Sequence, residues 1–576
     1  MMSSWRGRAS ILFVLAAAAV LAGEPGHEAP TSAIRLDQAG YPPTAPKIAA
    51  VVAQQTASEF LVRRAGDGSV VYRGVLNRPA FDPDSGDRVQ AAVFTALETE
   101  GRYFLDVPGV GRSWTFAIAQ DVYTRAYYLT ARAFYGMRCG TAVDLGPGFP
   151  GYRHPACHLE GAYHASSGKT GPKHNPGGWH DAGDYGRYMV NSGISTGTLL
   201  WTWELFGDKV REVSLRLPES GNGTPDLLNE IRWNLDWMLS MQDHDGGAWH
   251  KQTSERFPDF IAPDADRSVS FVIGTAKEPY KTSCATGDLA AVAAIAARAY
   301  QPFDARFAER CLRASRRAWI WLGRHPNVTF RNPPGVSTGE YGDADCSDER
   351  LWAAAELWRT TKEPAYERYF LDHFAENLPA LHQPRPEGWA NVAPMALWTY
   401  LLGGGANAPV AATIRAAVLE VADATVARTQ RHPYRQSLST ADYVWGSNGV
   451  AADYGVALLI ANIIRPDPRY VEAALNNLHY LLGCNPFSLS WVTQLGENSV
   501  RHPHHRPSGA QPGREPWPGL LAGGPNRNRQ DPVLQALPDL PPAKLYADDV
   551  ASYSSNEVAI NWNASLVFLL AGVMGR

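Results

Sequence analysis

Several features that would mark other classes of protein are missing from this chain. Its 53 Lys and Arg nearly balance 57 Asp and Glu, for a net charge of -4, so charge gives no reason to expect nucleic acid or an anionic membrane as a partner. The six cysteines are spread from Cys139 to Cys484, unlike the dense framework of a small secreted scaffold. No repeat of fixed period is visible. What remains is ordinary globular composition in 576 residues, a length that predicts two domains.

The N-terminus has the pattern of an export signal. Arg6 and Arg8 precede an apolar run from Ile11 to Ala22, which ends in small residues suitable for cleavage. The run is too short to span a bilayer, and no later stretch is expected to do so. We therefore expect a signal peptide at 1–22, no membrane anchor, and a secreted or periplasmic protein.

Two kinds of periodicity follow. Residues 31–119 alternate in short, β-branched runs separated by turn signals, which predicts a small immunoglobulin-like β-sandwich. From residue 120 to 576 the pattern is helical, with twelve segments and long glycine- and proline-rich connections at 140–186, 244–282, 324–347 and 484–555. Twelve helices with such loops favour an all-α (α/α)6 barrel, and an open helical array is the alternative.

The stretch from Gly177 to Tyr185 carries the strongest chemical signal. Asp181 and Asp184 stand three residues apart among glycines and aromatics, so they belong on a bent loop. Two neighbouring carboxylates can hold and deprotonate a water molecule. A calcium loop or a solvated turn would also fit. Trp179 and Tyr185 favour a sugar site, because aromatic side chains beside carboxylates commonly line one.

A partner acid is expected near the C-terminus. Glu557 is predicted in the first turn of a helix, where an acid often serves only the helix dipole. Here it stands near Tyr553 and Trp562, which would desolvate it and keep it protonated. We therefore expect Glu557 to act as a general acid.

A separate group joins two thiols to two imidazoles. Cys139, Cys157, His158 and His180 form the set of ligands that suits tetrahedral zinc. A Cys139–Cys157 disulfide with two unrelated histidines is the open alternative on spacing alone.

Three blocks give the chain a resemblance to glycoside hydrolase family 9, chiefly cellulases, in the subgroup with an N-terminal immunoglobulin-like module. They are GGWHDAGDY at 177–185, GENSVRHPHHR at 496–506 and YADDVASYSSNEVAINWNA at 546–564, and IRLDQAGYPPTAPK from Ile34 resembles the start of the module. The resemblance implies inverting hydrolysis of β-1,4-linked glycans, with Asp184 as base, Asp181 helping to hold the water and Glu557 as acid. It further implies that His504 and Arg506 contact the substrate and that Trp562 is an aromatic platform. A structural salt bridge is the other account of Arg506.

The same resemblance bears on metals. Members with this module carry zinc at positions matching Cys139, Cys157, His158 and His180, which favours zinc over the disulfide. The segment with Asp343, Asp348 and Glu349 is similar to a family calcium loop, although Asp348 would serve equally well as a helix cap. No organic cofactor is expected.

We therefore predict a monomeric endo-β-1,4-glucanase that acts on β-1,4-glucan or its oligosaccharides. An exo-acting enzyme on cello- or glucosamine oligosaccharides keeps the same fold and mechanism. A non-catalytic glycan-binding protein is disfavoured, because it would not need Asp181, Asp184 and Glu557 together.

Overall fold

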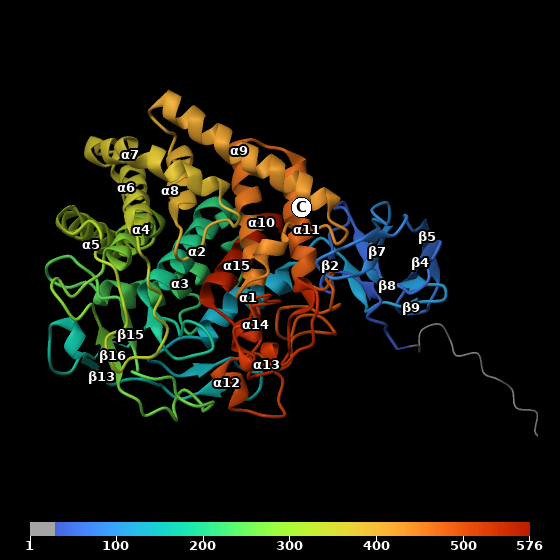
Figure 1. The fold of residues 1–576 in the computed structure, drawn as a ribbon, viewed down its shortest axis with the longest axis horizontal. Helices are drawn as coiled ribbons and strands as arrows, with labels where there is room; N and C mark the ends of the chain where they lie inside the picture. Colours follow the sequence, from blue (N-terminus) through green and yellow to red (C-terminus); the bar gives the residue numbers. More distant parts are fainter. Residues whose placement is uncertain (1–28, 175, 576) are drawn as a thin grey trace, which may run out of the picture.

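The computed structural model describes residues 29–174 and 176–575. A small β domain at the N-terminal end packs against the side of a much larger helical domain (Figure 1). The predicted signal peptide at 1–22 lies outside the described residues.

The β domain consists of two sheets around one core. One sheet has the strand order β1-β3-β7-β6, and the other has the order β2-β10-β8-β4-β5 with β9 beside β8. All pairs are antiparallel except β2 with β10. Side chains from both sheets, such as Val51 and Phe60, are buried in the same cluster. The strands are β1 (Ile34–Arg35), β2 (Gly40–Tyr41), β3 (Ile48–Val51), β4 (Glu59–Arg64), β5 (Val70–Val75), β6 (Ala80–Phe81), β7 (Arg88–Val93), β8 (Gly101–Val107), β9 (Gly111–Arg112) and β10 (Phe116–Ile118).

The second domain is built from helices. They are α1 (Thr124–Gly136), α2 (Met189–Val210), α3 (Asp226–Ser240), α4 (Ser283–Tyr300), α5 (Ala305–Arg324), α6 (Ser347–Thr361), α7 (Pro364–Asn377), α8 (Ala393–Leu402), α9 (Ala408–Arg431), α10 (Ser447–Ile464), α11 (Pro468–Leu481) and α15 (Ile560–Val573), with short α12 (Arg506–Gly509), α13 (Pro532–Gln535) and α14 (Tyr553–Asn556) in the last long connection. The twelve long helices, α1 to α11 and α15, agree in number with the twelve predicted segments.

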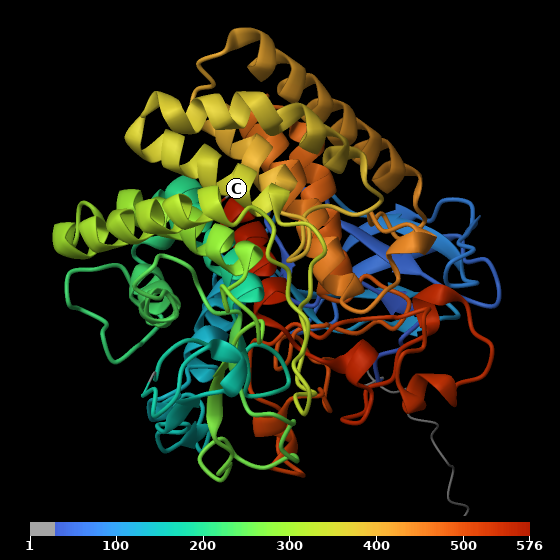
Figure 2. The same cartoon turned by 60° about the vertical axis from the view of Figure 1, so that its left-hand side comes forward.

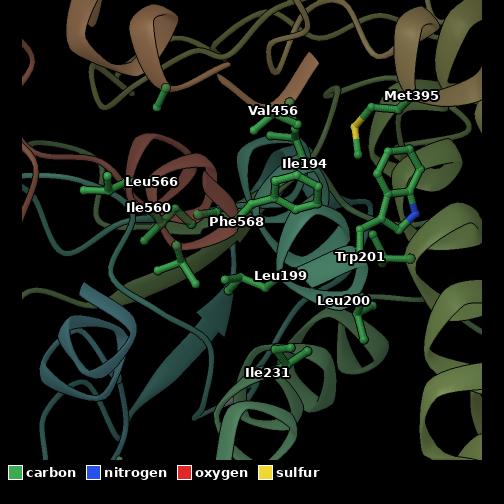
Figure 3. Packing of buried hydrophobic residues seen from close by; sticks show 14 of the residues in the cluster. Ile194, Leu199, Leu200, Trp201, Ile231, Met395, Val456, Ile560, Leu566 and Phe568 are labelled. Carbon is green, nitrogen blue, oxygen red and sulfur yellow. The ribbon is translucent and has the colours of Figure 1, made fainter. Parts of the chain in front are cut away.

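Six of these helices form a closed ring. α2 packs on α4, α4 on α6, α6 on α8, α8 on α10, α10 on α15, and α15 again on α2. Figure 3 shows this centre, where Trp201 and Leu199 of α2 lie among side chains from α8, α10 and α15. α1, α3, α5, α7, α9 and α11 lie outside the ring, each against ring helices, and Figure 2 shows α9 lying along the outside of the domain.

The ring helices and the outer helices differ in their pattern of apolar residues. A ring helix is covered on every side, so α4 and α15 are apolar nearly all round. The outer helix α5 has one buried stripe, including Phe307 and Cys311, and an arginine-rich solvent face. α10 is long and apolar enough to cross a membrane by composition, but it lies in the ring and is mostly buried.

The long connections contain a sheet that the sequence did not predict. It has the order β13-β16-β15-β14, and comprises β13 (Gly161–Tyr163), β14 (Arg187–Tyr188), β15 (Lys251–Thr253) and β16 (Ser270–Ile273). Strands this short leave too few residues for a period of two to be visible. β11 (Val143–Asp144) and β12 (Arg153–His154) form a further pair. The small sheet joins two long connections beneath the loop that holds Asp181 and Asp184.

Candidate active site

Asp181 and Asp184 lie on the loop that precedes β14 and α2. Asp181 accepts hydrogen bonds from Nδ2 of Asn191 at 2.8 Å and from the hydroxyl of Tyr341 at 2.6 Å. Asp184 accepts from the hydroxyl of Tyr188 at 2.9 Å and from the Gly186 amide at 3.0 Å. Burial, and next the charge of Asp184, raise the pKa of Asp181. Each carboxylate is therefore held in a fixed orientation by donors on its own loop, α2 or the loop near residue 340.

Glu557 approaches the same space from the C-terminal end of the chain. It was predicted in the first turn of a helix, but it lies in extended backbone between α14 and α15, because α15 begins only at Ile560. Its Oε2 accepts a hydrogen bond from the indole of Trp445 at 3.2 Å. Burial, and then the charges of Asp184 and Asp181, raise its pKa to about 8. Glu557 is thus an acid held protonated near neutral pH.

Backbone contacts join the two acidic segments. The amide and the guanidinium Nη1 of Arg506 both donate to the carbonyl of Gly183, at 3.1 and 2.9 Å. A Cβ at Gly183 would lie 2.1 Å from the carbonyl oxygen of His504, so only glycine permits this approach. The amide of His504 donates to the Asn556 carbonyl at 2.8 Å, and this hydrogen bond fixes the position of His504. The segment 504–506 therefore fixes the distance between the aspartate loop and Glu557.

These residues face one cavity of about 940 Å³. Its lining includes seven of the nine predicted catalytic and substrate residues: Asp181, Asp184, His504, Arg506, Tyr553, Glu557 and Trp562. A second cavity of about 680 Å³ shares Trp389, Trp445, Asn561 and Trp562 with the first. The two together form an extended, aromatic-lined space with the three acids at one part of it.

Two residues that were predicted to contact the substrate do not line this cavity. Trp179 is completely buried, packs on Phe134 at 4.7 Å between ring centroids, and donates from its indole to Glu230. Tyr185 is 5% exposed, and its hydroxyl donates to the Ile261 carbonyl. The prediction that both line the sugar site was wrong, because both side chains are buried against the fold and anchor the loop. The salt-bridge alternative for Arg506 was also wrong, since the described bonds of this side chain go to the Gly183 and Pro258 carbonyls.

Sequence reasoning missed four residues that hold the acids. Asn191, Tyr188, Tyr341 and Trp445 each donate to one of the three carboxylates. Tyr188 and Asn191 follow the aspartates closely in the sequence, so this proximity could have indicated that they contact the carboxylates. Tyr341 and Trp445 stand in distant connections, and the segment next to Tyr341 was interpreted as a calcium loop rather than as part of the acid site.

The predicted zinc ligands come together beside this loop. One ligand atom from each of Cys139, Cys157, His158 and His180 lies within 4.8 Å of all the others. Cys139 and Cys157 are both free thiols. Nε2 of His158 pairs with Asp266 at 3.2 Å, whereas its Nδ1 is buried without a hydrogen-bond partner. The disulfide alternative is therefore wrong in this structure, and the group is a candidate metal site.

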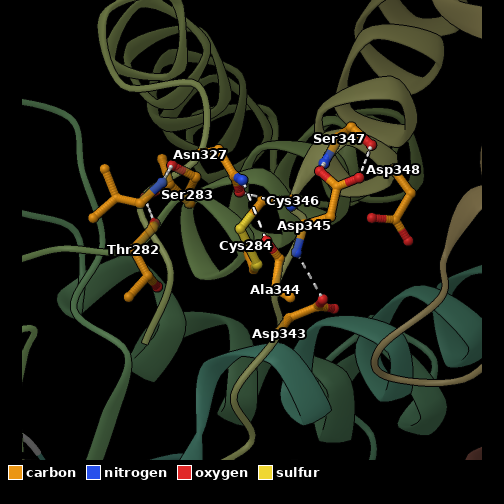
Figure 4. The surroundings of a disulfide bond; sticks show 12 residues. Thr282, Ser283, Cys284, Asn327, Asp343, Ala344, Asp345, Cys346, Ser347 and Asp348 are labelled. Atoms are coloured by element: carbon orange, nitrogen blue, oxygen red, sulfur yellow. Dashed lines mark hydrogen bonds between the residues drawn. A yellow bond between two sulfur atoms is a disulfide. The ribbon is translucent and has the colours of Figure 1, made fainter. Parts of the chain in front are cut away.

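The predicted calcium residues lie around a disulfide. Cys284 of α4 is bonded to Cys346, and Figure 4 shows Asp343, Asp345 and Asp348 on the segment beside it. Asp348 accepts from the Val392 amide at 2.8 Å rather than capping its own helix. Oδ2 of Asp343 and both carboxylate oxygens of Glu349 are buried without partners, as are both of Asp288. Burial raises the pKa of Asp343 to about 6. This region therefore contains more buried carboxylate oxygens than hydrogen-bond donors to them.

Sequence models of known families match both domains. The model of glycosyl hydrolase family 9 matches residues 123–570, and that of the cellulase N-terminal immunoglobulin-like domain matches residues 29–112.

Individual relatives span almost the whole chain. Endoglucanase D of Acetivibrio thermocellus is 38% identical over 549 residues, covering 94% of this chain and 83% of the relative. A cellodextrinase of Butyrivibrio fibrisolvens is 34% identical, covering 94% and 99%. Among solved structures, a Zn-binding triple mutant of the family 9 endoglucanase J30 superimposes with a TM-score of 0.85 at 35% identity, covering 92% of this chain and 99% of that one.

Proposed function

This chain belongs to glycosyl hydrolase family 9, and from its site we propose that it is an endo-β-1,4-glucanase that inverts the anomeric carbon. One observation carries the proposal: two hydrogen-bonded aspartates and a protonated glutamic acid, from segments far apart in the chain, line a single cavity with aromatic walls. Single-displacement hydrolysis needs a base for water on one side of the sugar and an acid for the leaving oxygen on the other.

Each acid has a distinct role in this scheme. Asp184 takes the proton from water, and Asp181 accepts a second hydrogen bond from that water and orients it. Glu557 delivers its proton to the departing oxygen, which its raised pKa allows. Trp445 donates to Glu557 and would stabilise the carboxylate that remains after the transfer.

Contacts away from the reacting bond support a polymeric substrate. Trp389, Trp445 and Trp562 lie where the two cavities meet, so several sugar rings can stack in succession. His504 and Tyr553 add polar groups near the acids. A cleft that continues beyond the catalytic acids favours cutting within a chain, whereas an exo-acting enzyme needs a closed end.

Product analysis separates the two modes of action. We expect cellohexaose to give several product lengths at once, and the viscosity of soluble cellulose to fall well before many reducing ends appear. Release of a single short product from the outset would favour the exo-acting alternative. Faster cleavage of glucosamine oligomers than of cello-oligosaccharides would move the substrate away from glucan, and mixed-linkage glucan tests the linkage preference.

We further assign the catalytic domain, residues 120–576, to the (α/α)6 barrel class, and residues 31–119 to the immunoglobulin-like module. The closed ring of six helices and the outer helix beside each pair support the barrel assignment. The ends of the family matches lie within a few residues of these bounds at the domain junction.

We propose that Cys139, Cys157, His158 and His180 hold a structural zinc. Two thiols, two imidazoles and the unpartnered Nδ1 of His158 fit its donor preference, and Asp266 would fix the ring of His158. His180 adjoins Asp181, so a metal here would restrain the catalytic loop. For calcium, the unpartnered oxygens of Asp343 and Glu349, with Asp348 close by in sequence, fit a hard cation.

Export of the protein is part of the same proposal. The Cys284–Cys346 disulfide suits an oxidising compartment, in accord with the predicted signal peptide. We propose that the enzyme acts as a secreted or periplasmic monomer.

A further inference from the structure

Lys251 is a buried lysine near the active site, and burial lowers its pKa to about 7. It begins β15, is 0% exposed, and pairs across the sheet with Tyr188 of β14. Among the ion pairs of the described residues, none includes Lys251. A buried ammonium without a carboxylate partner is costly unless every proton is used, so this residue needs another explanation.

The side-chain amine of Lys251 donates its hydrogen bonds to one segment of the chain. Nζ donates to the carbonyl of Gly339 at 2.7 Å and lies 3.1 Å from Oγ1 and 3.3 Å from the carbonyl oxygen of Thr338. It also donates to Oδ1 of Asn332 at 2.7 Å, and Nδ2 of Asn332 in turn donates to the Thr338 carbonyl at 2.8 Å. The lysine therefore holds residues 338–339 directly and through Asn332.

The next residues of that segment reach the catalytic aspartates. The hydroxyl of Tyr341 donates to Asp181, and the ring of Tyr341 packs on Tyr188, whose hydroxyl donates to Asp184. The backbone of Tyr341 has a φ of +47°, a left-handed conformation that a bulky residue adopts only when its surroundings impose it. His250, beside Lys251, adds a contact from Nε2 to the Glu340 carbonyl at 3.0 Å.

We propose that Lys251 is a positioning residue for hydrolysis: by binding residues 338–339 it imposes the turn that keeps the Tyr341 hydroxyl on Asp181. The inference rests on the proposed function of Asp181 and Asp184. Removing the amine of Lys251 releases the strained turn, and Asp181 then loses the Tyr341 hydroxyl that holds its carboxylate in place.

The test compares Lys251→Met with Tyr341→Phe and the double variant. We expect Lys251→Met to lower kcat on cellohexaose by about tenfold or more, the scale of one lost charge-assisted hydrogen bond, with KM changed far less. Tyr341→Phe should also lower kcat with KM changed far less, because it removes the same hydrogen bond to Asp181. The double variant should be no slower than the slower single variant. Losses that multiply, or a loss confined to KM, would overturn the proposal.

Two controls separate positioning from general damage. Lys281→Met removes another buried lysine, which pairs with Asp243 and Asp245, and should lower the melting temperature without lowering kcat. If Lys251→Met does not fold, Thr338→Val removes one acceptor of the lysine and should give a smaller loss of kcat with KM little changed, and an unchanged kcat would count against Lys251. Hydrogen exchange in the peptide around residue 340 should rise in Lys251→Met, a readout that does not depend on the enzyme's substrate. Unchanged exchange there would overturn the proposal even if the wild type proved inactive on glucans.

Discussion

In the proposed mechanism, Glu557 and Asp184 have opposite roles within one cavity. Glu557 gives up a proton, and Asp184 takes one from water. The Tyr188 hydroxyl and the Gly186 amide donate to Asp184, whereas burial and two nearby carboxylates raise the pKa of Glu557. The raised pKa of Glu557 supports its proposed role as the acid.

Replacing either group should therefore abolish most activity while the fold remains. We expect Asp184→Asn and Glu557→Gln each to lower kcat by about 10²–10⁴-fold, the usual range for a lost general base or acid. Glu557→Gln should be partly spared on aryl glycosides with good leaving groups, which need little protonation. Steady-state kinetics on cellohexaose and on such a glycoside check both expectations. Equal loss on every leaving group would count against Glu557 as the acid.

The raised pKa of Glu557 makes two predictions about pH. Activity should fall as pH rises through about 8, because the acid then loses its proton. For stability, the folded protein holds this proton at a pH where the unfolded chain has lost it, so the contribution of Glu557 becomes less favourable from its ordinary range, near pH 4.5, up to about 8. Glu557→Gln should therefore raise the melting temperature at pH 8 more than at pH 4. An equal change in melting temperature at both pH values would mean that the fold does not raise the pKa of Glu557.

The stereochemistry of the product tests the base directly. If Asp184 activates water rather than attacking carbon, the first product from a β-linked substrate is the α-anomer. Proton NMR early in hydrolysis, before mutarotation, distinguishes the anomers. An initial β-anomer, or a sugar ester on Asp184, would contradict the single displacement.

Among the elements, the long helices and the longer strands of the β domain follow from sequence pattern because each has enough residues to show a period. β4, β8 and α4 have six, seven and eighteen residues, which is long enough for a pattern of period 2 or 3.6 to show. The small sheet with β15 shows no such pattern, and its strands β13 and β14 pair with strands of the distant connection at 244–282. Non-local pairing leaves no local signal.

The site divides in the same way. The motif residues were predicted because chemistry restricts their type and spacing, whereas spacing alone left the candidate zinc ligands open to a disulfide, and the family resemblance favoured zinc. The wrong positions of Trp179 and Tyr185 came from treating every aromatic residue of the loop as a lining residue, although a loop needs some side chains as anchors. Tyr341 and Lys251 have roles only through contacts that the fold creates.

The proposed zinc site gives a prediction at the scale of the elements. Purified protein should contain about one zinc per chain. Cys157→Ser should reduce zinc content, melting temperature and activity together, because the group adjoins His180 and the aspartate loop. Cys311→Ser, a buried free cysteine of α5 remote from the group, is the matched control and should retain zinc. Zinc retained at full occupancy in Cys157→Ser would exclude this residue as a ligand.

At the scale of the whole molecule, the β domain and the helical domain share buried polar contacts. Asp37, 0% exposed, pairs with His479 of α11 at 2.9 Å and accepts a hydrogen bond from Tyr123 at 3.2 Å. The ring of Tyr41 packs on His479 at 4.9 Å. Gln38 bonds the Ser488 and Asn498 carbonyls in the connection that leads to the His504 segment. The β domain thus supports one side of the structure that holds Arg506 and His504.

If these contacts make the two domains one cooperative unit, breaking the Asp37 pair should destabilise both. Asp37→Ala leaves His479 buried without its carboxylate partner and removes one of the acceptors of Tyr123, which should lower the free energy of unfolding by about 3–5 kcal/mol. The matched control is Asp106→Ala, whose partner Arg63 lies within the β domain and is partly exposed, and it should change stability by about 0–1 kcal/mol. Urea unfolding, followed by far-ultraviolet circular dichroism and by residual activity, checks this. Both signals should shift together in Asp37→Ala, because helix α11 and the connection near residue 498 lose the same support. A shift no larger than that of Asp106→Ala would mean that the domains are stable independently, and that the β domain does not support the catalytic site.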